Sequence, residues 1–239
     1  MKNAALTHLR CATVANAEVS SGIVGYQQIT VGTGYHLFTV TFGEVGNTAG
    51  TFNINGIKVF QNGAEYTQNN KVILQKMDST GAYLNVYNYR KAKGGWCAGA
   101  TLQTDVTVVD GEAVCINNTT GADIELQVAG EVNLNPWSGT LVAGYSLCGN
   151  MTPNTINLND VVPYQNGEVY ASNNKVLLQK MDSTGAYLDV YNYRKGKGGW
   201  CSGTTLKTDI TLAPGESFCV NNNTGAAIQL KFKNPVVAE

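Results

Sequence analysis

A long internal repeat constrains the fold more than any other feature of this sequence. Residues 69–99 recur as residues 173–203 at an offset of 104 residues, with 27 identities in 31 positions. A period of that length corresponds to a small domain, since solenoid repeats are about 20–50 residues long. The sequence therefore predicts two copies of one module, residues 18–130 and 131–239, preceded by an N-terminal segment of residues 1–17.

The local patterns within each module predict β-strands joined by tight turns. Residues 72–77 have high strand propensity, residues 78–81 form a turn sequence, and residues 82–89 alternate in a way that places Tyr83, Tyr87 and Tyr89 on one face. Seven or eight such strands per module indicate an all-β chain. We expect two tandem β-sandwich domains, jelly-roll-like or Ig-like, that arose by internal duplication.

Cysteine spacing gives an expectation about the cellular compartment. Cys97 and Cys115 recur as Cys201 and Cys219, and each pair is separated by 18 residues. An even number of duplicated cysteines predicts one disulfide per module, which requires an oxidising compartment and therefore export. The alternatives are buried reduced thiols or, less favoured because ligands are lacking, a zinc site. The two cysteines outside these pairs, which we expect to bond within one chain or between chains, are Cys11 and Cys148.

The N-terminal segment partly resembles a secretory signal. Lys2 is basic and residues 15–17 read Ala-Asn-Ala, a cleavage pattern, but His8 and Arg10 interrupt the apolar core that a signal peptide needs. The segment is either a truncated signal or an arm of the mature protein. No apolar stretch reaches the roughly 20 residues that span a bilayer, so no transmembrane segment is expected.

The second module resembles a β-repeat of about 100 residues found in exported bacterial proteins of the cell envelope. The resemblance is carried by residues 143–147, 163–167, 185–187, 198–200 and 212–218, and residues 128–132 resemble the short segment that usually follows this repeat. It covers most of both modules and implies an exported protein with tandem β domains at the cell surface. It implies no activity, and the paired cysteines are not part of its pattern.

The sequence offers little catalytic chemistry. The net charge of -1 and the lack of a basic face argue against nucleic-acid binding. His8 and His36 do not recur in the other module, and no nucleotide, metalloprotease or nucleophile motif is present. We expect no enzyme activity, cofactor or metal, and we assign the duplicated acidic residues to turns. These are Asp78 and Asp182, Asp105 and Asp209, and Glu112 and Glu216.

Two functions are compatible with these features. The first is an extracellular structural protein whose copies assemble into a fibre, sheath or surface array, with N-terminal strands exchanged between neighbours. The alternative is a carbohydrate-binding or adhesin module that stacks sugars on paired aromatic residues, although packing in the core or at the contact between modules is the favoured explanation of the same residues. The aromatic residues in question are Trp96, Trp200, Tyr83, Tyr87, Tyr187 and Tyr191.

Overall fold

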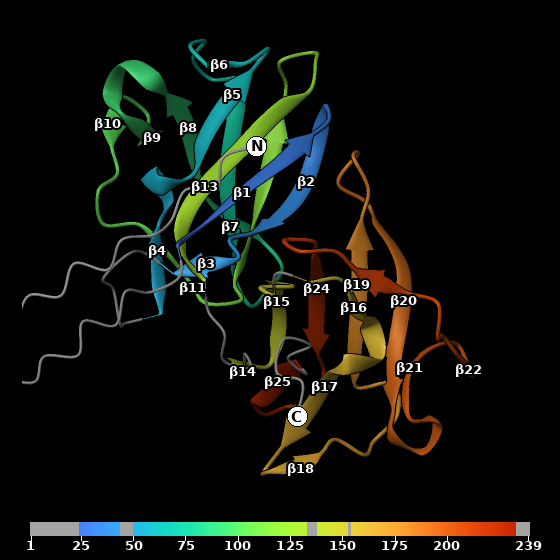
Figure 1. The fold of residues 1–239 in the computed structure, drawn as a ribbon. Coiled ribbons are helices and arrows are strands. Elements are labelled where there is room, and N and C mark those ends of the chain that lie inside the picture. Colours follow the sequence, from blue (N-terminus) through green and yellow to red (C-terminus); the bar gives the residue numbers. More distant parts are fainter. Residues whose placement is uncertain (1–23, 44–49, 133–137, 153, 233–239) are drawn as a thin grey trace, which may run out of the picture.

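The computed structural model describes residues 24–43, 50–132, 138–152 and 154–232 (Figure 1). Strands and four three-residue 3-10 helices are all the regular structure in these residues, so the expected all-β class is confirmed. The four 3-10 helices are η1 (Ile54–Gly56), η2 (Lys91–Lys93), η3 (Leu158–Asp160) and η4 (Lys195–Lys197).

The first half, residues 24–132, has two large sheets and one small one. The first sheet has the order β1-β13-β5-β6, and β3 also pairs with β13. Its strands are β1 (Val24–Val31), β3 (Phe42–Gly43), β5 (Lys58–Gln61), β6 (Ala64–Glu65) and β13 (Ile124–Val132). The second has the order β10-β9-β8-β7-β12-β2. Its strands are β2 (Gly34–Thr39), β7 (Val72–Met77), β8 (Tyr83–Arg90), β9 (Gly95–Ala98), β10 (Thr101–Leu102) and β12 (Ala113–Asn118). The small sheet pairs β4 (Thr51–Asn53) with β11 (Thr107–Val109).

The second half, residues 138–232, follows nearly the same plan. One sheet has the order β14-β25-β17-β18. Its strands are β14 (Ser138–Leu141), β17 (Val161–Gln165), β18 (Glu168–Val169) and β25 (Ile228–Phe232). The other has the order β15-β24-β19-β20-β21-β22. Its strands are β15 (Gly144–Gly149), β19 (Val176–Met181), β20 (Tyr187–Arg194), β21 (Gly199–Ser202), β22 (Thr205–Leu206) and β24 (Ser217–Asn222). The small sheet pairs β16 (Ile156–Asn157) with β23 (Thr211–Leu212).

The predicted hairpin of residues 72–89 forms as β7 and β8. Asp78 closes its turn, because its Oδ1 accepts hydrogen bonds from the backbone N–H groups of Thr80 and Ala82. The hydrogen bond from the Thr80 hydroxyl is the main reason that the pKa of Asp78 lies below its usual value. Gly81 has a φ of 88°, which glycine adopts without strain. Asp182 closes the β19–β20 turn in the same way, so the turn assignment of these two acidic residues is confirmed.

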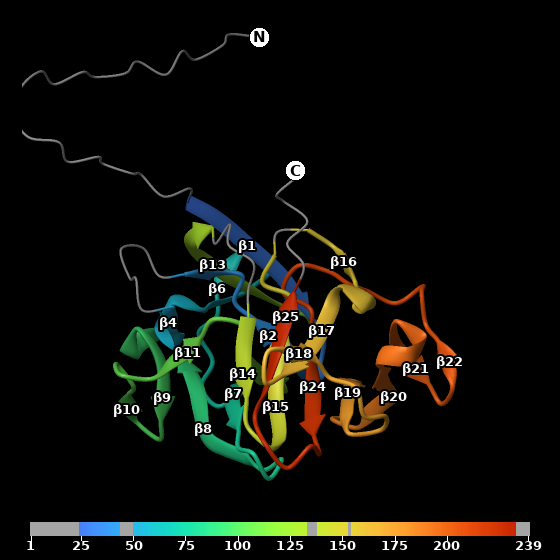
Figure 2. The same cartoon turned by 90° about the horizontal axis from the view of Figure 1, so that it is seen from below.

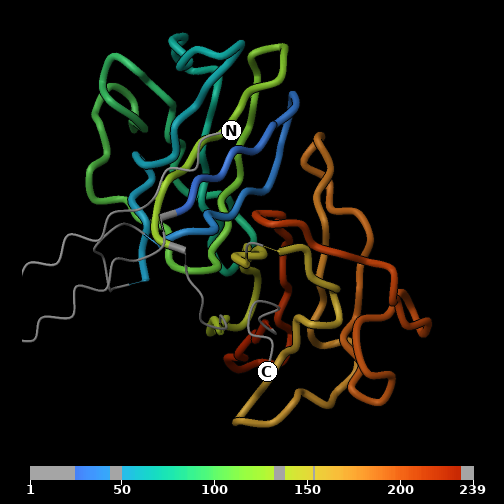
Figure 3. Tube along the Cα trace, in the orientation of Figure 1, coloured from blue at the N-terminus to red at the C-terminus, as the bar shows by residue number. Residues whose placement is uncertain are grey.

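Each half has its own hydrophobic core, to which both large sheets contribute. In the first half, for example, Leu126 of β13 and Leu74 of β7 belong to one buried cluster, and in the second half Leu230 of β25 and Leu178 of β19 belong to another. A third cluster contains residues from both halves. Figures 1 and 3 show the two halves side by side. Strands β2, β7 and β12 of the first half each contact β15 of the second half. The six-stranded sheets therefore bury one face in their own core and part of the other face against the opposite half.

Candidate functional site: the face between the two halves

The disulfide prediction is wrong, because the structure places the paired cysteines far apart. Cys97 lies on β9 and Cys115 on β12, and β8 and β7 lie between them. Three strand spacings of about 4.8 Å separate such residues by roughly 14 Å, whereas bridged Cα atoms are about 4.4–6.8 Å apart. Cys201 and Cys219 have the equivalent arrangement, and all four thiols are free and buried.

The predicted bond of the remaining two cysteines, within one chain or between chains, stays a prediction. Cys148 on β15 is free and only 1% exposed, and it belongs to the core of the second half. Cys11 lies outside the described residues. The disulfide argument for an oxidising compartment therefore has no support in the structure.

The two tryptophans considered for sugar binding are core residues and do not form a ligand surface. Trp96 and Trp200 are both 0% exposed. Each indole N–H donates to a backbone carbonyl of its own half, at 3.0 Å from Ile57 O and 2.7 Å from Val161 O respectively. Each ring also packs edge-to-face on a tyrosine of the neighbouring strand. A sugar cannot stack on these indoles while the halves are folded.

The tyrosine alternation predicted for residues 83–89 is interrupted by a β-bulge. Asn85 has a φ of 46°, and the register between β7 and β8 shifts opposite it. An extra residue in one strand reverses the faces of the side chains on either side of it. As a result, Tyr87 is buried in the core of the first half, whereas Tyr83 joins the cluster between the halves. Asp189, with a φ of 43°, has the same effect in the second half.

The second-half tyrosines follow the same division. Tyr191 is buried in the core and Tyr187 lies between the halves. The six aromatic residues considered for sugar binding therefore belong to three separate clusters, and they form no common exposed face. The sequence allowed either sugar binding or a role in the core and in the contact between modules. The structure places these six residues in the two cores and in the contact between the halves.

The contacts between the halves are reciprocal. Tyr35 N donates to Ser183 O at 2.8 Å, and Tyr145 N donates to Ser79 O at 2.9 Å. Both carbonyls belong to hairpin turns of the opposite half. An interface in which each partner uses the same patch is isologous, as in a twofold-symmetric homodimer. The face between the halves is therefore a dimer-like interface within a single chain.

The side chains of this face are also arranged in reciprocal pairs. The Tyr83 hydroxyl donates to Met181 Sδ at 3.4 Å, and the Tyr187 hydroxyl donates to Met77 Sδ at 3.8 Å. Burial raises the pKa of both tyrosines well above the usual value. The remaining apolar members of the cluster are Tyr35, Leu37, Ala113, Cys115, Tyr145, Leu147 and Cys219.

The cysteines at this face are poor nucleophiles. Burial raises the pKa of Cys115 and of Cys219 to about 11. The thiolate is the reactive form of cysteine, so these groups stay protonated and inert near neutral pH. Both cysteines lie between the six-stranded sheets, where they contribute to packing.

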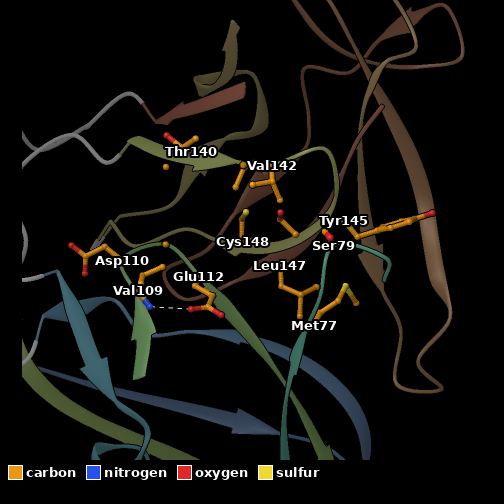
Figure 4. A pocket seen from close by; sticks show the side chains of 14 residues that line it. Met77, Ser79, Val109, Asp110, Glu112, Thr140, Val142, Tyr145, Leu147 and Cys148 are labelled. Atoms are coloured by element: carbon orange, nitrogen blue, oxygen red, sulfur yellow. Dashed lines mark hydrogen bonds between the residues drawn. The ribbon is translucent and has the colours of Figure 1, made fainter. Parts of the chain in front are cut away.

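A cleft of about 260 Å³ opens at one margin of the interface (Figure 4). Its apolar rim includes Val109 and Val142, which are 53% and 56% exposed. Glu112 lies in the lining but is engaged locally, because one carboxylate oxygen accepts from Val109 N at 3.0 Å and the other pairs with Lys76 at 2.9 Å. This carboxylate thus organises a turn, as expected, and is not poised for acid–base chemistry.

The described residues contain no group of three or more His, Cys, Asp or Glu side chains that could hold a metal ion. Within the same residues, no helix has both the length and the apolar character needed to cross a membrane. A comparison of the chain with family models, with curated proteins and with solved structures finds no match.

Proposed function

We propose that this protein is a structural subunit whose copies join by strand addition at the free edge of β1. In this proposal each half is a β-sandwich module, the two modules arose by duplication, and their common face fixes them as one rigid building block. The resemblance to repeats of exported bacterial proteins supports a place outside the cell or on its surface.

The observation that carries the proposal is the edge of β1, which pairs with no further strand among the described residues. This strand pairs with β13 without interruption from Val24 to Val31, and it ends its sheet (Figure 2). Its sequence VGYQQITV contains no charged residue and no proline. Proteins usually protect exposed edges with charges, prolines, bulges or short strands, because an open edge pairs readily with another chain. β1 has none of these protections.

The other edges contrast with β1. Among the described residues, every other edge strand has four residues or fewer or, like β2 and β15, donates backbone hydrogen bonds to the opposite half. β1 meets the opposite half through the side chains of Gln27 and Ile29, which lie beside Gly215. A cleft of about 260 Å³ also borders β1, between Tyr26, Phe42 and Pro214. In strand addition, backbone hydrogen bonds supply affinity and pockets beside the edge select side chains. β1 therefore provides both elements of an acceptor site.

The donor in this proposal is the segment that precedes β1, taken from a neighbouring copy. Residues 1–17 lie just before the acceptor strand in the sequence and can extend over roughly 55 Å, which allows them to reach a second molecule. Donor and acceptor are different surfaces, so the contact is head-to-tail and makes a filament when its rotation does not close. Because the described thiols are buried and unbonded, assembly should not depend on oxidation.

The test places lysines along the acceptor edge at the exposed positions Tyr26, Gln28 and Thr30. We expect the unaltered protein to form assemblies that grow with concentration in light scattering and electron microscopy, with or without reductant. The triple lysine variant, of about 25.5 kDa, and the smaller variant lacking residues 1–17 should both remain single chains. The matched control adds the same three charges at exposed apolar positions away from β1, namely Leu84, Leu188 and Val190.

Two results would refute the proposal. One is an unaltered protein that stays a single chain at all concentrations although its mass shows residues 1–17 to be present. The other is a β1 lysine variant that assembles as well as the control variant.

A further inference from the structure

The face between the halves is built from nearly identical residues on its two sides. Five positions of the first half recur unchanged in the second and lie in the same cluster: Tyr35 and Tyr145, Leu37 and Leu147, Met77 and Met181, Tyr83 and Tyr187, and Cys115 and Cys219. By these residues alone, a first half would bind another first half as well as it binds a second half.

The equivalence ends where β2 and β15 end, because Thr39 corresponds to Gly149 there and the paired residues Ala113 and Ser217 also differ. Thr39 and Gly149 occupy corresponding ends of β2 and β15, and each donates its backbone N–H to a turn of the opposite half. A Cβ atom on Gly149 would lie 2.1 Å from Thr39 Oγ1 and 2.6 Å from Thr39 Cβ, far closer than real Cβ contacts. The Thr39 side chain therefore fills the space that glycine leaves empty, and it donates to or accepts from the Ser217 hydroxyl at 2.8 Å.

The glycine is required by this neighbour and not by its own backbone. Gly149 is absent from the residues with positive φ, so a side chain at this position meets no conformational barrier. What excludes a side chain is the presence of Thr39 and, at 2.7 Å, of Ser217 Oγ. Position 149 is thus shaped to receive a threonine from the other half.

We infer that this face is a recognition surface specific for the unlike half, with Thr39 against Gly149 as the determinant. Two first halves would bring two threonines into a space that holds one. Two second halves would place Gly149 against Gly149 and leave a void beside the Ser217 hydroxyl, which would keep only its hydrogen bond to the carbonyl of Gly215 in its own half. Specificity of this kind comes from excluding the wrong partner as much as from favouring the right one.

The two halves belong to one chain, and residues 133–137 of their connection lie outside the described residues. A tether raises the effective concentration of its two ends, so a complementary face closes within one chain when the tether can reach. When the tether cannot reach, the face of a first half binds the second half of another copy instead. The determinant, Thr39 against Gly149, is separate from the exposed β1 positions Tyr26, Gln28 and Thr30, and the inference does not rest on the proposed function.

The test begins with the folded full-length chain, carrying a protease site within residues 133–137. After cleavage, native mass spectrometry at micromolar concentration should show the two pieces bound one to one. Mixing with isotope-labelled cleaved protein should yield exchanged pairs of a first piece with a second piece, and no pairs of like pieces. Separation of the pieces at this concentration, or like pairs at the statistical proportion, would overturn the inference.

Substitutions at the determinant make the test specific. Gly149→Thr should weaken the binding of the pieces at least tenfold. Adding Thr39→Gly should restore it, because the remaining close atom, Ser217 Oγ, can rotate away from the new side chain. Thr39→Gly alone should allow pairs of two first pieces to appear. Gly196→Thr serves as a control, because Gly196, like Gly149, lacks a positive φ and nothing lies within 4 Å of a Cβ at that position. Failure of Thr39→Gly to rescue Gly149→Thr would contradict the assignment.

The uncut chain gives a second measurement that does not depend on cleavage. Cys115 and Cys219 are buried at the face, so their labelling by a thiol reagent reports its opening. Gly149→Thr should accelerate the labelling of these two thiols, and Thr39→Gly should reverse the increase. Unchanged labelling in Gly149→Thr would also overturn the inference.

Discussion

Alanine at both Gly34 and Gly144 should open the face between the halves while leaving each hydrophobic core intact. A Cβ atom on either glycine would lie 2.1 Å from a carbonyl oxygen of the opposite half, on Ser183 and Ser79 respectively. Those carbonyls accept the reciprocal backbone hydrogen bonds of the interface. The substitutions therefore displace both turns and break both hydrogen bonds.

Two contributions set the free-energy cost of the double substitution. Both glycines have positive φ, 95° and 101°, where alanine costs about 1–2 kcal/mol per residue. The two lost hydrogen bonds add about 1 kcal/mol each, which affects only the interface. Because 1.36 kcal/mol corresponds to a tenfold change, about 2 kcal/mol should raise the opening equilibrium of the face roughly 30-fold.

Thiol labelling followed by peptide mass spectrometry measures this opening. The variant should label about 30-fold faster at Cys115 and Cys219 than a control variant, Gly121→Ala with Gly225→Ala. The control glycines also have positive φ but have open space around the new Cβ atoms, so they reproduce the backbone strain without the clash. Equal labelling of both variants at these thiols would refute the reasoning, as would uniform acceleration at all thiols.

Three further predictions concern the cores, the bulge and the pH dependence. Trp96→Ala or Trp200→Ala should lower the free energy of unfolding by about 3–5 kcal/mol in urea titrations, and unchanged stability would contradict the burial of the indoles. Asn85→Val should cost about 1–2 kcal/mol at its positive φ, while Asn85→Gly should be nearly neutral; the same assay distinguishes them. Because the folded pKa of Cys115 and Cys219 is raised from 9.0 to about 11, their contribution to stability is complete below pH 9 and is lost as the pH rises toward 11. The slope should reach about 1.4 kcal/mol per pH unit for each thiol and should flatten when both are replaced by alanine.

Local features of the chain were predictable because neighbouring residues determine them. The hairpin of β7 and β8 follows from strand propensity on both sides of a turn sequence, and its closure by Asp78 follows from the hydrogen-bonding range of a short carboxylate. The repeat itself predicts that whatever the first half forms, the second half forms too. These inferences need no knowledge of distant contacts.

The failed inferences all depend on distant contacts. Strict alternation placed Tyr83 and Tyr87 on one face, but the bulge at Asn85 puts them on opposite faces of the sheet. The spacing of 18 residues between Cys97 and Cys115 is compatible with a disulfide, but it does not reveal that two other strands lie between theirs. Strand order depends on pairings between segments that are far apart in the sequence.

The sequence alone thus determined the strand class, the turns and the equivalence of the two halves, because backbone propensities and a long repeat act locally and can be read residue by residue. The tertiary structure decided which side of each strand is buried, which cysteines are neighbours and how one half recognises the other. A strand has two faces and two edges that are equivalent until they pack. Only the packing of the sheets, within each half and across the face of Thr39 and Gly149, distinguishes them.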